Sequence, residues 1–99
     1  MIIVAGTFRI DEAKIDDLLP LARATLAATR KEEGCITYSY AFDIEDRGLI
    51  RVYEAWESLS CLEAHFKQPH MQPWRAKLGE LGASERKIVR YETGEGAPV

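Results

Sequence analysis

The residues best suited to chemistry lie between positions 49 and 74, a stretch that holds both histidines and both tryptophans of the chain. Trp56 comes first, and His65 and His70 follow on either side of Pro69. An imidazole has an unperturbed pKa of about 6.5, which lets it take up and release protons at neutral pH. A tryptophan nearby could form one wall of a pocket for an aromatic ligand. These residue types therefore favour acid–base chemistry on an aromatic molecule.

Each of these side chains also has a structural interpretation. His65 lies at the edge of an apolar helical face, so it is either a general base or a latch for the turn before Pro69. Trp56 is either a pocket wall or a core residue, since buried tryptophans mostly pack. For His70 we favour a role in capping or pinning the helical segment that follows. Glu54 shares a strand face with Trp56, and we expect it to pair with an arginine of the last strand or of a partner chain.

A metal site is the other chemistry that this stretch allows. Its ligands would come from Cys61, His65 and His70, with Glu57 or Glu63 as the carboxylate. A proline separates the two histidines, however, and neither an H-E-x-x-H nor a paired CxxC motif occurs. We therefore expect no metal, with a site of two histidines and one carboxylate as the open alternative. No motif typical of flavin, nicotinamide or phosphate binding is present, so we expect no cofactor.

Hydrophobic periodicity predicts the elements that position these residues. The predicted strands are 2–10, 35–43, 49–57 and 84–93, and helical spacing follows residue 11, residue 58 and residue 70. Pro20 should kink the first helix or split off a short first piece, and Gly34 should occupy the position after its end. The second helix should begin either at Ser58 or with a capping box of Ser60 and Glu63.

This order of elements is that of two βαβ halves joined by a hairpin, the ferredoxin-like α+β fold. The third strand is apolar on both faces, with Val52 and Trp56 on one and Tyr53 and Ala55 on the other. Helices can cover only one face of the sheet, so a second sheet from a partner chain would have to cover the other. The pattern therefore favours a homodimer.

The length of 99 residues predicts one domain spanning 1–99, with residues 94–99 as a tail that is loose or docks on a partner. The formal net charge is -3, which gives nucleic acid little to bind. The densest cationic group is Arg86, Lys87 and Arg90, and in a strand it would be split between two faces. We therefore expect no nucleic acid partner.

No apolar segment reaches the roughly 20 residues that cross a bilayer, so we expect no membrane partner. The apolar start of the chain at 1–4 has no cationic segment before it and predicts a strand, not a signal peptide. Cys35 and Cys61 follow no CxxC spacing, and we interpret them as free thiols in a reducing cytoplasm.

Three short motifs in this order, YEAWES at 53–58, LEAH at 62–65 and PH at 69–70, resemble the antibiotic biosynthesis monooxygenase family. The Glu-Gly-Cys sequence at 33–35 is also similar to the helix-to-strand junction of that family. The resemblance covers nearly the whole chain. It implies a ferredoxin-like domain with an antiparallel sheet that pairs into a dimeric α/β barrel.

The resemblance also implies a cofactor-independent monooxygenase that oxidises small electron-rich aromatics of the quinol, phenol or anthrone type with dioxygen. In that mechanism a base removes a phenolic proton, and the anion passes an electron to dioxygen inside an apolar pocket. His65 is the candidate base, with Trp56 as the second catalytic candidate. The candidate substrate-binding residues are Tyr40, Glu54, Phe66, His70 and Trp74.

The sequence contains no asparagine, which disfavours the haem-degrading branch of the family with its Asn-Trp-His set. Thr7 is the residue near the expected asparagine position, and it carries no amide. Two other functions fit the same barrel: a non-catalytic dimeric module that binds a small ligand or serves in stress, and an isomerase.

Overall fold

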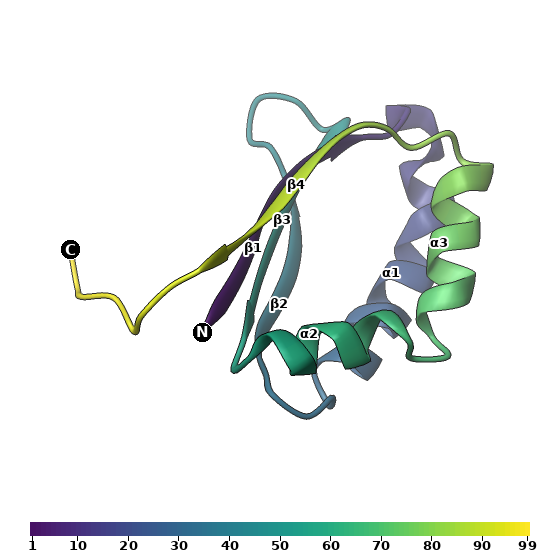
Figure 1. The fold of residues 1–99 in the computed structure, drawn as a ribbon. Helices are drawn as coiled ribbons and strands as arrows, with labels where there is room; N and C mark the ends of the chain where they lie inside the picture. The colour runs from purple at the N-terminus through teal and green to yellow at the C-terminus, as the bar shows by residue number, and fades with distance from the viewer.

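The chain folds into one antiparallel sheet with all of its helices on one face (Figure 1). The computed structural model describes residues 1–99. The strands are β1 (Ile2–Arg9), β2 (Cys35–Phe42), β3 (Leu49–Trp56) and β4 (Ser84–Glu92), in the sheet order β2-β3-β1-β4. The helices are the short 3-10 helix η1 (Glu12–Lys14), α1 (Ile15–Thr29), α2 (Leu59–Phe66) and α3 (Met71–Glu80). This arrangement confirms the predicted ferredoxin-like α+β fold.

The first helix runs through Pro20 without a break. A short first piece does split off, but it is η1, which ends at Lys14, well before the proline. Asp11 begins η1 as its N-cap, accepting a hydrogen bond from the backbone of Ala13. Pro20 lies on the exposed side of α1, where the carbonyl that loses its hydrogen bond can bind water. The predicted short first piece is therefore present but ends before the proline, which does not divide the helix.

The first helix also ends earlier than predicted, at Thr29, so Gly34 does not terminate it. A turn of residues 30–34 connects α1 to β2. Gly34 closes this turn with φ of +77°, and a Cβ there would overlap the side chain of Cys61. Glycine is required at this position because its backbone has a left-handed conformation and because the side chain of Cys61 in α2 leaves no room for a Cβ atom.

Helix α2 begins at Leu59 with Ser58 as its N-cap, whose hydroxyl accepts a hydrogen bond from the backbone N–H of Cys61 at 3.3 Å. The alternative capping box of Ser60 and Glu63 is wrong, because Ser60 already lies in the first turn of the helix. The chain then turns at Pro69 before α3 begins, as the sequence predicted.

The core lies between the sheet and the helices, where Trp56, Tyr38 and Leu62 are almost fully buried. The opposite face of the sheet carries no element of this chain (Figure 1). On that face the side chains of Tyr53, Val89 and Tyr91 are 48%, 51% and 55% exposed. One face of the sheet is thus a core and the other is an apolar surface.

The last residues, 94–99, form no regular structure and are exposed, and they point away from the domain (Figure 1). None of the helices has both the length and the apolar character required to cross a membrane. Both cysteines are free thiols.

Candidate functional site

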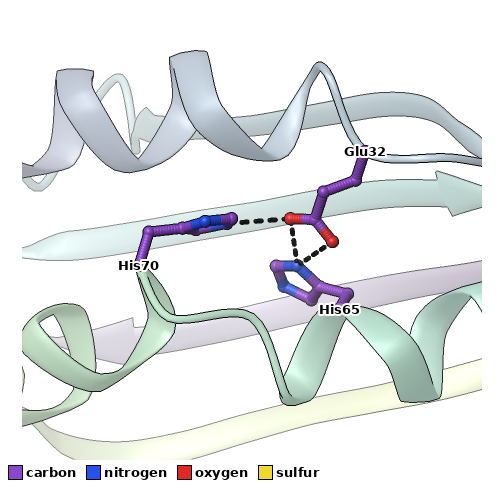
Figure 2. Close-up of side chains that lie close together, drawn as sticks. All are labelled: Glu32, His65 and His70. Carbon is purple, nitrogen blue, oxygen red and sulfur yellow. Dashed lines mark hydrogen bonds and ion pairs between the residues drawn. The ribbon is translucent and has the colours of Figure 1, made fainter.

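Two histidines share one carboxylate at the end of the domain where α2 meets α3 (Figure 2). Nδ1 of His65 lies 2.9 Å from Oε2 of Glu32, and Nε2 of His70 lies 2.8 Å from the same oxygen. The hydroxyl of Thr29 is 3.2 Å from Nε2 of His70. The side chains of His65 and Glu32 are only 2% and 8% exposed, so water has little access to the contact between them.

The topology brings these residues together from distant parts of the sequence. Glu32 lies in the turn before β2, whose first residue, Cys35, pairs with Trp56 at the end of β3. The start of β2 and the end of β3 therefore lie at the same end of the sheet, and α2 begins directly after β3. As a result the turn that holds Glu32 lies beside the helices that hold the histidines.

His65 is arranged as a neutral imidazole with one nitrogen free. Burial lowers its pKa, and the hydrogen bond and negative charge of Glu32 partly oppose that effect. A carboxylate can only accept, so Nδ1 carries the proton and donates it to Glu32. Nε2 then holds a lone pair and has no hydrogen-bond partner in the protein. This is the state that a general base requires.

A cavity of about 440 Å³ lies between the sheet and helices α2 and α3, and His65 is part of its wall. Four of the predicted substrate-binding residues also line it: Tyr40, Glu54, Phe66 and Trp74. The rings of Tyr40 and Trp74 stack with centroids 5.4 Å apart. Most of the lining residues are hydrophobic, so the cavity is large and apolar enough for a small aromatic molecule.

Trp56 does not line this cavity, although we expected it to form a wall. Its ring is fully buried, lies 4.8 Å from the His65 ring centroid, and donates a hydrogen bond of 2.9 Å to Glu54. No arginine of this chain forms an ion pair with Glu54, whose hydrogen-bond partner is this indole N–H, so the expected pair with the last strand was wrong and the pair with a partner chain stays a prediction. Burial raises the pKa of Glu54, whereas the Trp56 hydrogen bond and the charge of Arg86 lower it. Trp56 can therefore influence a bound ligand only indirectly, by positioning Glu54 and His65, which do line the cavity.

Three arginines lie in the cavity wall: Arg75, Arg86 and Arg90. None of them forms an ion pair with a carboxylate of the chain, whose seven ion pairs all involve other residues. Arg75 donates only to the backbone carbonyl of Phe66, at 2.7 Å. The cavity thus combines apolar walls with cationic groups that are free to pair with an anion.

His70 pins the start of α3 to the end of α1 through Glu32 and Thr29, and its side chain does not cap the helix. It is absent from the cavity wall.

The structure also changes the candidate metal ligands, because the carboxylate beside the histidines is Glu32 and not Glu57 or Glu63. Sequence reasoning missed Glu32 because it stands in a run of charged residues and looks solvated.

Known proteins are similar to this chain in both sequence and fold. The sequence model of the antibiotic biosynthesis monooxygenase family matches residues 1–77. The chain belongs to this family. A candidate antibiotic biosynthesis monooxygenase from Deinococcus radiodurans has the same fold, with a TM-score of 0.91, 28% identity, and coverage of 100% of this chain and 98% of the other. Membership in the family supports a monooxygenase-like function in general terms.

Two curated relatives are longer than this chain. One is an uncharacterised protein from a Synechocystis strain, 28% identical over 95% of this chain and 64% of its own length. The other is a candidate monooxygenase from Mycobacterium tuberculosis, 34% identical over 65% of this chain and 62% of its own length. The chain thus spans less than two thirds of the length of these relatives.

Proposed function

We propose that this protein is a cofactor-independent monooxygenase that oxidises small electron-rich aromatics of the quinol, phenol or anthrone type with dioxygen. The observation that carries the proposal is the pair of His65 and Glu32: His65 lines a largely hydrophobic cavity, and its Nε2 has no hydrogen-bond partner in the protein. The proposal rests also on the family to which the chain belongs.

In the first step Nε2 of His65 takes the proton of a phenolic hydroxyl. Glu32 stabilises the imidazolium that forms, because its carboxylate lies 2.9 Å from Nδ1. The arginines of the wall, Arg75, Arg86 and Arg90, stabilise the phenolate, since they pair with no carboxylate of the protein. The hydrophobic residues that make up most of the lining lower the local dielectric constant, so these charges interact more strongly than they would in bulk water.

In the second step the phenolate passes one electron to dioxygen, and the resulting radical and superoxide join at a ring carbon. The peroxide takes the proton back from the His65 imidazolium and becomes a hydroperoxide. Loss of water from a carbon that still bears hydrogen leaves a carbonyl group. One oxygen atom enters the product and the other leaves as water, and the substrate supplies all of the electrons, so no outside reductant is required.

Oxygen uptake with a panel of hydroquinones, measured with and without a chelator, tests the proposal. We expect uptake that depends on the substrate and survives chelation. Ligand binding without uptake would favour the binding module instead, and conversion of a ligand without oxygen would favour the isomerase.

The free thiols of Cys35 and Cys61 fit the reducing cytoplasm, in which we place the protein.

We further propose that the protein works as a homodimer. The uncovered face of the sheet carries Ile3, Tyr53, Val89 and Tyr91, which a second sheet would remove from water. The small size of the chain makes this burial valuable, because a chain of about 100 residues builds only a modest core. Packing two such sheets face to face gives the dimeric barrel of the family.

Replacing Tyr53 with Asp should shift the protein towards the monomer, because it places a charge in the centre of this apolar face. Sedimentation at micromolar concentration measures the effect. Gln72→Asp, at an exposed position of α3 on the helix side of the sheet, is the control for added negative charge. A wild-type protein that sediments as a stable monomer of 11.2 kDa would contradict the dimer.

Replacing Glu32 with Gln should lower kcat/KM by about 10–100-fold, since the imidazolium loses its counter-charge. Because burial lowers the pKa of His65, the wild-type enzyme should keep its activity to a pH below the ordinary imidazole value of about 6.5. Glu32 opposes that lowering, so its removal should move the acid limb of the pH profile to still lower pH. Glu33→Gln, an exposed neighbour, is the matched control. An unchanged profile in Glu32→Gln would show that the carboxylate does not act on the base.

A further inference from the structure

We propose that Glu32, His65 and His70 form a binding site for a divalent transition metal of the zinc class, and that the bound metal blocks the base. The first part concerns metal binding alone and stands apart from catalysis. The second part rests on the proposed function of His65.

The three side chains offer a ligand set that such metals prefer. One nitrogen of each imidazole and one carboxylate oxygen of Glu32 lie within 4.8 Å of one another, and Oε2 of Glu32 contacts both Nδ1 of His65 and Nε2 of His70. Imidazole together with carboxylate is a common ligand set for zinc and its neighbours in the first transition series. The ligands come from three separate segments, the turn after α1, the last turn of α2 and the start of α3.

The charges at this position also favour a cation. The Glu32 side chain is only 8% exposed, yet its ion-pair partners are the two histidines, with no lysine or arginine among them. A buried carboxylate is stable when a positive charge compensates it, and a divalent ion would supply that charge.

Binding requires the three side chains to adjust their spacing. A zinc ion lies about 2.0–2.1 Å from each ligand atom, which places neighbouring ligands roughly 3.3 Å apart in a tetrahedral site. The two contacts to Glu32 are 2.9 and 2.8 Å long, so each must open by roughly half an ångström, whereas the ligand atoms that lie farthest apart, within 4.8 Å, must close by up to roughly 1.5 Å. The hydrogen bonds give up their protons as the metal enters. The His70 side chain is 23% exposed, which leaves a path from solvent.

The metal would lie behind His65 as seen from the cavity, since neither Glu32 nor His70 lines the cavity. It would therefore be out of reach of a substrate there. A neutral imidazole bound through Nδ1 carries its proton on Nε2, the nitrogen that has no partner in the protein. Nε2 then has no lone pair to accept the phenolic proton. Occupation of the site should therefore inhibit the reaction.

Calorimetric titration of the whole chain with zinc tests the site, compared with Glu32→Gln, His70→Gln and the exposed control Glu33→Gln. We expect one zinc per chain in the wild type and in the control, and at least about 10²-fold weaker binding in the other two variants. Circular dichroism of each variant confirms that it is folded. Equal zinc affinity in all four proteins, or no binding to the wild type, would overturn the site.

Two measurements test the blocked base. Long-range ¹H–¹⁵N NMR should show the metal on Nδ1 of His65 and the proton on Nε2, and the opposite arrangement would overturn inhibition while leaving the site intact. With an active substrate, zinc should abolish oxygen uptake by the wild type, and a chelator should restore it. Uptake that zinc does not change in a protein shown to bind zinc would also overturn inhibition. A protein that binds zinc but oxidises no substrate would instead contradict the proposed function.

Discussion

Replacing His65 with Gln is expected to slow turnover of an active aromatic substrate about 10²–10⁴-fold while leaving aromatic binding largely intact. The side chain that is lost is the one histidine that lines the cavity, and its Nε2 has no hydrogen-bond partner in the protein. Glutamine is close to histidine in volume and can still donate a hydrogen bond to Glu32, so the turn before Pro69 should keep its structure. The effect should therefore appear in kcat and not in ligand affinity.

Three measurements on the same samples distinguish a catalytic role of His65 from a purely structural role. They are stopped-flow measurement of the turnover rate, titration of a ligand and thermal unfolding. If His65 is only a latch, the substitution should lower the melting temperature and leave turnover per folded molecule unchanged. His65→Ala adds a further test, because added imidazole could enter the space and restore part of the rate. Full turnover in His65→Gln would mean that the base lies elsewhere.

The fold could be predicted from the sequence because hydrophobic periodicity and breakers act locally. Strand alternation in 49–57 and helical spacing after Ser58 are visible in any short window, and Pro69 marks the break between two helices. The errors fell where tertiary packing decides. Pro20 remains inside α1 because its side of the helix is exposed, and Gly34 serves the packing of a turn on Cys61. Neither condition is visible in the residues alone.

The site was predicted only in part, for a related reason. His65 was recognisable because a histidine at the edge of an apolar face has few chemical alternatives. Glu32 was not, since nothing near it in the sequence distinguishes it from Glu33. Only the pairing of Cys35 with Trp56 places its turn beside α2. A search for carboxylates in the turn that the ferredoxin topology puts next to the helix pair would have found it.

Replacing Trp56 with Ala is expected to lower the free energy of unfolding by about 3–5 kcal/mol, the range for a large aromatic side chain removed from a core. The ring is 0% exposed and packs edge-on against Tyr38, with centroids 6.3 Å apart, and against the ring of His65. Urea unfolding at a fixed protein concentration measures the loss, because dimer formation would make the apparent stability depend on concentration.

Trp56→Phe separates packing from hydrogen bonding. It keeps an aromatic ring but removes the indole N–H that binds Glu54 at 2.9 Å, so its cost should be smaller than that of alanine. Because Trp56 does not line the cavity, ligand affinity per folded molecule should change little in this variant. A large loss of affinity in a fully folded Trp56→Phe protein would show that the Trp56–Glu54 pair orients the ligand. A loss well below about 3 kcal/mol in Trp56→Ala would show that the core around the ring can collapse to fill the space.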